Sequence, residues 1–148
     1  MGKKKVVISR QKPGTDTIKS YINVDAYYSE YPSWCFNSCD RMCWKIGEHE
    51  LWEEILPKLQ NLESQTWKEI LVKAKSNNHS IETESLNKIA RDRLSDLHIE
   101  AEALISLRLN GTHRLYGYMQ KSAFCILWYD TEHGDDAECV CRSYKKHT

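Results

Sequence analysis

The sequence predicts an α+β fold in which three helices pack on a small, mainly antiparallel sheet. Apolar residues recur at helical spacing in the middle of the chain, and the period changes to two further on. Short runs of residues that favour strands precede the helices. At 148 residues the chain fits a single domain, 1–148, with N-terminal strands and an irregular segment over 1–47 and helices plus a β-meander over 48–142.

Two strands and an irregular segment are expected in the N-terminal third. Residues 5–9 (KVVIS) and 17–28 (TIKSYINVDAYY) are rich in residues that favour strands. Residues 29–47 contain Pro32, three cysteines and two tryptophans, a composition that predicts irregular structure. We expect the aromatic side chains of this segment to cover the edge of the core.

The first two helices are expected over 48–62 and from residue 66 to about 75. The first carries one apolar face made of Leu51, Ile55, Leu59 and Leu62. Pro57 interrupts this face and predicts a kink or two helical pieces, because proline cannot donate the helical hydrogen bond. The second helix begins at a capping box, in which Thr66 and Glu69 would satisfy each other's free backbone amides.

The third helix is expected over about 83–97, and strands follow it. Its stripe consists of Leu86, Ile89, Ala90, Arg93, Leu94 and Leu97. Arg93 is the single polar member of this stripe. Apolar residues then alternate with others over 104–109 and 124–128, which predicts strands, and 137–144 is a candidate for a last edge strand.

The hairpin between the first two strands of the meander has a defined expected geometry. Asn110-Gly111 is the preferred centre of a two-residue type I′ turn. The pairs expected from that turn are Leu109 with Thr112, Arg108 with His113 and Leu107 with Arg114. Arg108 and His113 would then share one face, and the other face would carry Arg114, Tyr116 and Tyr118. By this alternation the two arginines point apart, and a β-bulge would be needed to bring them to one site.

The distribution of charge points to a phosphate ligand. The chain as a whole is balanced, with 21 Lys and Arg against 21 Asp and Glu, which argues against coating of nucleic acid by bulk electrostatics. From 103 to 129, however, there is no Asp or Glu. The basic groups there and just beyond are Arg108, His113, Arg114, Lys121 and His133. A β-surface with cations and imidazoles but no carboxylates is suited to holding a phosphate.

Motifs for most cofactor and metal chemistries are absent, and no cofactor or metal is expected. The sequence lacks P-loop, dinucleotide-binding, serine hydrolase and zinc protease motifs, and it has no Cys-x-x-Cys pair. Cys139 and Cys141, two apart on an expected strand, would point their sulfurs to opposite faces. The start of the chain does not resemble a signal peptide, and no apolar run approaches the roughly 20 residues of a membrane span. We therefore expect a cytoplasmic protein with reduced thiols and no membrane contact.

The stretch SLRLNGTHRLYGY, followed by AFCILWYDTEH, resembles the RelE/YoeB/HigB superfamily of bacterial toxin ribonucleases. The resemblance covers 48–142 by order of elements and is closest over 104–133. The same stretch also resembles small uncharacterised bacterial and phage-borne proteins with the pattern RLxGxxR…LWxDxxH. In this sequence the fixed positions of the pattern are Arg108, Leu109, Gly111, Arg114, Leu127, Trp128, Asp130 and His133.

The resemblance implies a RelE-like, metal-independent endoribonuclease of a toxin–antitoxin pair. Its partners would be RNA or ribosome-bound mRNA and an antitoxin protein. Arg108 and Arg114 match arginines that contact the phosphate, and His133, His113 or Tyr129 would transfer protons. An imidazole titrates near pH 6.5 and suits this role at neutral pH.

Other interpretations of the same residues stay open. Arg114 is a candidate for an ion pair with a carboxylate from the helices, and His133 for a hydrogen bond to Asp130. His113, beside a tight turn, is a candidate for a solvated side chain, while Phe124 and Trp128 fit the core better than a base-stacking surface. The alternative function is a non-catalytic protein-interaction module, a phage- or defence-associated binder that docks through the tryptophans and cysteines of 29–47.

Overall fold

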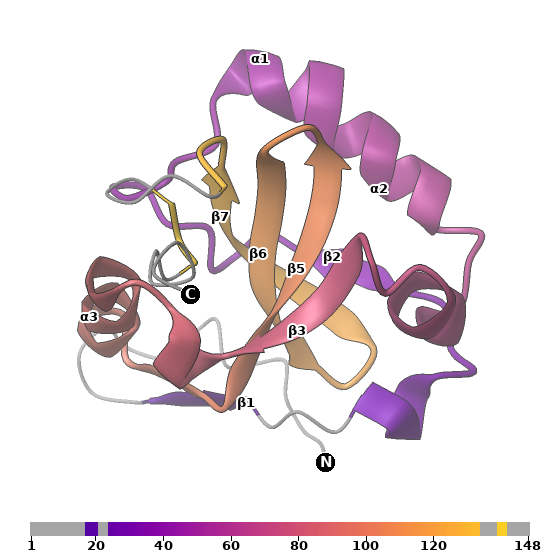
Figure 1. Ribbon diagram of the computed structural model, residues 1–148, viewed down its shortest axis with the longest axis horizontal. Helices are drawn as coiled ribbons and strands as arrows, with labels where there is room; N and C mark the ends of the chain where they lie inside the picture. Colours follow the sequence, from indigo (N-terminus) through magenta and orange to yellow (C-terminus); the bar gives the residue numbers. More distant parts are fainter. Residues whose placement is uncertain (1–16, 21–23, 134–138, 142–148) are drawn as a thin grey trace.

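The computed structural model describes residues 17–20, 24–133 and 139–141 (Figure 1). The strands are β1 (Ile18–Ser20), β2 (Ser33–Cys35), β3 (Asn78–Glu82), β4 (Ile99–Ala101), β5 (Ala103–Asn110), β6 (His113–Gln120) and β7 (Ala123–Asp130). The α-helices are α1 (Glu48–Glu50), α2 (Leu56–Leu62) and α3 (Lys88–Asp96). Two π-helical segments, η3 (Leu51–Ile55) and η4 (Glu69–Lys73), and two 3-10 helices, η2 (Val24–Tyr27) and η5 (Thr83–Ser85), complete the described elements.

The central sheet has five strands in the order β2-β7-β6-β5-β3. Its pairs are antiparallel except for β2, which runs parallel to β7 at one edge, and a separate parallel pair joins β1 to β4. The α+β class is therefore correct, but the mixed sheet is larger than the small sheet expected from the sequence. Strand β3, which pairs with β5, was not expected, because its residues lack an alternating apolar pattern.

The helical predictions hold with local changes. Helix α1 continues through η3 into α2 without a gap, and Pro57 occupies the first turn of α2, so a π-helical segment before the proline is found in place of two separate helical pieces. The capping box is confirmed, since the Thr66 amide donates to Glu69 Oε1 at 2.9 Å and the Glu69 amide to Thr66 Oγ1 at 3.3 Å. The third helix is shorter than expected, because the Asn87 side chain caps α3 by accepting from the Ile89 amide. Ile89 is consequently exposed and not part of the buried stripe.

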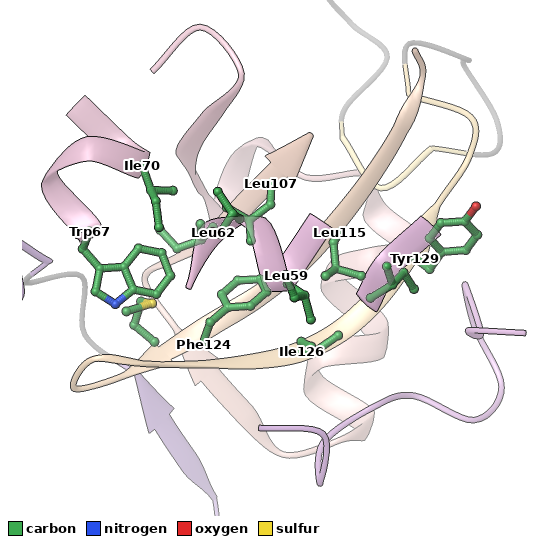
Figure 2. Close-up of a cluster of buried hydrophobic side chains, with 12 residues drawn as sticks. Leu59, Leu62, Trp67, Ile70, Leu107, Leu115, Phe124, Ile126 and Tyr129 are labelled. Carbon is green, nitrogen blue, oxygen red and sulfur yellow. The ribbon is translucent and has the colours of Figure 1, made fainter. Parts of the chain in front are cut away.

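Two apolar clusters lie on opposite faces of the sheet. The first lies between the sheet and the α1–α2 side, and Figure 2 shows its side chains running from Trp67 to Tyr129. The second lies between the other face and α3 (Figure 1). Phe124 belongs to the first cluster and Trp128 to the second, and both are fully buried, as the core interpretation expected.

The irregular segment 29–47 is held against the second cluster by Asp40. Its buried carboxylate accepts from Arg93 at 2.7 and 2.9 Å and from the Trp128 indole at 2.9 Å. Burial favours the protonated acid, but the hydrogen bonds from Arg93, the Met42 amide and Trp128 outweigh it and lower the pKa of Asp40 to about 2. Arg93, the polar member of the predicted stripe, therefore points inward because its guanidinium binds the buried carboxylate of Asp40 there.

Several expectations concern the ends of the chain. The strand expected over 5–9 lies outside the described residues. In place of one strand over 17–28, the described parts form β1 and η2. The edge strand expected over 137–144 falls within the described residues only at 139–141. There Cys141 forms an isolated antiparallel bridge with Leu86. None of the helices in the described part of the chain has the length and apolarity to span a membrane.

Candidate functional site

The β5–β6 hairpin has a different register from the one expected. Arg108 pairs with Arg114 and Asn110 with His113, and the register shifts between Arg108 and Asn110. The turn follows Asn110 and is made by Gly111, whose φ is +42°, and Thr112. The prediction that Arg108 and His113 share a face is therefore wrong. The irregularity places the two arginines on one face and the Asn110–His113 pair on the other.

Four side chains on the α1–α2 side form a compact group, which we call the Glu54 cluster: Glu54, Asn110, His113 and Tyr129. Glu54 comes from η3 and lies with its two oxygens 2.7 and 3.0 Å from His113 Nδ1. The Tyr129 hydroxyl donates to one oxygen of Glu54 and the Asn110 amide to the other. Tyr129 also lies 3.2 Å from His113 Nδ1. The cluster thus ties η3 to the end of the hairpin and of β7.

The electrostatics of the Glu54 cluster favour an ionised carboxylate. Burial disfavours the charge, but hydrogen bonds from Tyr129, His113 and Asn110 outweigh it and hold the pKa of Glu54 below its usual value. Burial and the bond to Glu54 raise the pKa of Tyr129, so the phenol stays protonated. The Glu54 and His113 side chains are 16% and 33% exposed. Both oxygens of the Glu54 carboxylate therefore accept hydrogen bonds from within the cluster.

The opposite face of the same hairpin carries a second group, which we call the arginine face: Ser106, Arg108, Arg114 and Tyr116. Arg114 donates to the carbonyl oxygens of Gly111 at 2.7 Å and His113 at 3.2 Å. Arg108 donates to the Asn77 side chain at 3.3 Å. Among the described residues, no carboxylate oxygen lies within 4.0 Å of either guanidinium. The alternative in which Arg114 forms an ion pair with a helix carboxylate is therefore not found among the described residues.

The arginine face also contains groups that are not satisfied. Burial and the neighbouring charge of Arg108 lower the pKa of Arg114. Next to the arginine pair along the strands lies the pair Ser106 and Tyr116. Both hydroxyls are buried, and neither makes a hydrogen bond of normal geometry to a described residue, although Ser106 lies close enough to Tyr116 to act on the pKa of that phenol. Such orphaned groups are rare in proteins and call for a ligand or water.

His133 lies beyond the end of β7, at the turn end of the hairpin. Its amide donates to the Thr112 carbonyl at 3.2 Å, and its Nδ1 lies 3.6 Å from Cys141 Sγ. Cys141 in turn acts electrostatically on Arg114 and Tyr116, which puts His133 on the side of the arginine face. The buried carboxylate of Asp130 accepts hydrogen bonds from the amides of Glu132 and Val140.

The five residues proposed from the sequence therefore separate into two groups. Arg108, Arg114 and His133 lie on the side of the arginine face, whereas His113 and Tyr129 belong to the Glu54 cluster. Sequence reasoning missed Glu54 altogether. The sequence offered one indication of its role, because Glu54 lies three residues after Leu51, at the border of the first apolar face. Its partners, however, lie 56 or more residues away in the sequence.

Comparisons of the chain with protein-family models, curated proteins and solved structures give no match. Among the residues that the structure describes, no three His, Cys, Asp or Glu side chains are arranged to hold a metal ion. The chemistry of the two groups on the hairpin is therefore the basis for a function.

Proposed function

We propose that the protein is a RelE-like, metal-independent endoribonuclease that holds an RNA phosphate on the arginine face. One observation supports this most strongly: Arg108 and Arg114 face each other across β5 and β6 with no carboxylate within 4.0 Å among the described residues. Two adjacent guanidinium groups repel each other, and a phosphate relieves that repulsion. The planar fork of arginine also matches phosphate oxygens in geometry.

The orphaned hydroxyls of Ser106 and Tyr116 support the same proposal. Leaving a buried hydroxyl without a partner costs about 1–3 kcal/mol, so two of them at one place are unusual in a merely structural surface. A hydrated phosphate held by the neighbouring arginines would bring hydrogen-bond partners to this part of the sheet. The Glu54 cluster contains an ionised carboxylate, which would repel a phosphate, and this is why we do not place the phosphate there.

His133 is the group on this side that can transfer protons. In the proposed reaction its imidazole takes the proton of the RNA 2′-hydroxyl, whose oxygen attacks the adjacent phosphorus. The bond from phosphorus to the 5′-oxygen breaks, and the imidazolium returns the proton to that oxygen. Arg108 and Arg114 stabilise the negative charge that develops on the phosphate oxygens. The products are a 2′,3′-cyclic phosphate and a 5′-hydroxyl end.

The substrate and partners follow from the resemblance. RNA, free or bound to ribosomes as mRNA, would be cut in the cytoplasm, and an antitoxin protein would restrain the enzyme. Expression of the chain alone in bacteria should then slow growth, while Arg114→Ala should remove that effect without lowering the level of folded protein.

The direct test measures RNA cleavage by the purified protein, with free RNA and in a translating extract. We expect 2′,3′-cyclic phosphate ends with the wild type and a loss of about 100-fold or more for Arg114→Ala and His133→Ala. Arg91→Ala on α3 and His79→Ala on β3 are matched controls that should cut normally. Intact RNA under both conditions, or normal cleavage by Arg114→Ala, would overturn the proposal.

A second candidate is a protein-interaction module, favoured by exposed apolar side chains on the irregular segment. Met42 is 77% exposed, and Tyr31 and Phe36 are exposed as well. The two tryptophans of this segment face inward, since Trp34 packs edge-on against Trp67 and Phe124, and Trp44 packs against Trp128. A docking surface would therefore use Met42 and its exposed neighbours in place of the tryptophans.

This candidate makes a different prediction from the nuclease. Met42→Asp should abolish capture of the partner, a host or defence protein, while RNA stays intact with the wild type. Retained capture by this variant would exclude the exposed part of the segment as the docking surface.

A further inference from the structure

Cys139 and Cys141 bring two thiols together near the arginine face. All six cysteines of the chain are described, and all are in the thiol form. The Sγ atoms of Cys139 and Cys141 are 3.0 Å apart, so the expectation that they point to opposite faces is wrong. The reason is that Cys139 and Val140 lie outside any strand, and Cys141 forms only an isolated bridge. A disulfide would require an approach of about 1 Å.

The surroundings of this pair favour reaction at Cys141. His133 Nδ1 lies 3.6 Å from Cys141 Sγ and can accept its proton, and the charge of Arg114 acts on the same thiol. A cysteine that lies beside an imidazole and a guanidinium has the kind of neighbours that reactive cysteines have. Cys139 donates to the Cys141 carbonyl at 2.9 Å and is fully buried, whereas Cys141 is 4% exposed. Because both residues are buried, the basic neighbours of Cys141, and not its exposure, single it out for the first oxidation.

We propose that Cys139 and Cys141 form a peroxide-reactive dithiol, in which Cys141 is oxidised first and Cys139 then closes a disulfide. The Cys141 thiolate attacks one oxygen of hydrogen peroxide, the O–O bond breaks, and a sulfenic acid and one water result. The Cys139 thiol attacks the Cys141 sulfur, an S–S bond forms, and the hydroxyl leaves as a second water. Two thiols lose two electrons and two hydrogens, and one peroxide is reduced to two waters. The reaction does not depend on RNA cleavage.

The chain contains an internal comparison. Cys35 and Cys125 are also neighbours, as partners on the parallel strands β2 and β7. The electrostatic neighbours of Cys125 among the described residues are Cys35 and Tyr118, neither of which is a cation. Burial and Cys35 raise the pKa of Cys125 to about 12, so the Cys125 thiol stays protonated at neutral pH. Proximity alone therefore does not make a reactive dithiol, and the basic neighbours distinguish the C-terminal pair.

The test uses the folded, reduced, full-length protein and one equivalent of hydrogen peroxide. Cleavage after Glu138 and Arg142 releases residues 139–142, which separates this pair from Cys125. We expect mass spectrometry to show a loss of two hydrogens on that peptide, reversed by dithiothreitol. Cys139→Ser should instead trap a sulfenic acid on Cys141 that dimedone labels. Cys141→Ser should react at least tenfold more slowly.

Two further variants test whether the reaction needs the other thiol pair and the imidazole beside Cys141. Cys125→Ser should oxidise like the wild type, and His133→Asn should oxidise several-fold more slowly while its circular dichroism spectrum is unchanged. A first disulfide between Cys35 and Cys125 would overturn the proposal. So would equal reaction rates for the wild type and Cys141→Ser, because the reaction would then not begin at this thiol.

Discussion

The Glu54 cluster and the arginine face lie on opposite sides of one hairpin, and they differ in whether their charged groups are paired. In the Glu54 cluster the carboxylate, imidazole, phenol and amide bind one another. On the arginine face two like charges lie side by side, with two orphaned hydroxyls next to them. The first arrangement stabilises the fold, because every removal leaves a partner unsatisfied. On the arginine face Tyr116 packs in the second apolar cluster, but the two guanidinium groups repel each other, and this repulsion is the feature on which the proposed anion site rests.

Replacement of Asp40 should destabilise the protein more than any substitution in the Glu54 cluster or on the arginine face. Replacement by alanine leaves Arg93 and the Trp128 indole without their carboxylate beneath the irregular segment. We expect Asp40→Ala to lower the free energy of unfolding by about 3–5 kcal/mol. Urea unfolding followed by tryptophan fluorescence measures this, and a loss below about 1 kcal/mol would contradict the assigned role of the ion pair.

Acid should act on the same group. The folded pKa of Asp40 is about 2, below the roughly 3.9 of an unfolded aspartate, so its contribution is present above about pH 4. This contribution to the free energy of unfolding, about 2–3 kcal/mol, is lost as the pH falls through about 2. The lowered pKa of Glu54 acts in the same direction. Unfolding free energies at pH 7, 4 and 2.5 test this, and Asp40→Asn should show a smaller loss between the last two.

Glu54→Gln should have the next largest effect. It removes the charge and leaves Tyr129 and His113 without a full set of acceptors. We expect a loss of about 1–3 kcal/mol of unfolding free energy and RNA cleavage close to the wild-type rate. Glu53→Gln, on the same π-helical segment, is the matched control with unchanged stability. A stable Glu54→Gln variant without RNA cleavage would move the catalytic centre to this cluster.

Tyr129→Phe should cost less, about 1 kcal/mol. The ring stays in the first apolar cluster, and the hydrogen bond from the phenol to Glu54 is lost. Differential scanning calorimetry is sensitive enough to detect this change. A cost as large as that of Glu54→Gln would mean that the phenol holds the cluster together by itself.

The smallest effect on stability should come from the arginine face. Arg108→Gln removes a charge that repels Arg114 and loses one long contact to Asn77. We expect a change within about 0.5 kcal/mol, in the direction of greater stability at low salt. A loss above about 1 kcal/mol in the same unfolding experiment would show that Arg108 has a structural role.

Local patterns predicted the parts of the fold that depend on near neighbours. The capping box at Thr66 and the polar position of Arg93 in an otherwise apolar stripe could be found from residues a few positions apart. The hairpin register could not, because Asn110 is held by Glu54, which lies 56 residues earlier. The pairing of the two arginines follows from that register, so it was beyond sequence reasoning as well.

The measurement that tests the central claim most directly is the binding of a 2′-O-methyl RNA oligonucleotide, which cannot be cleaved, over a range of salt concentrations. We expect the wild type and Glu54→Gln to bind with the same Kd and the same salt dependence. The double variant Arg108→Gln, Arg114→Gln should bind at least tenfold more weakly, with a slope of log Kd against log salt that is smaller by about 1.4. Equal binding by the double variant and the wild type would contradict the account, as would an equal loss in Glu54→Gln.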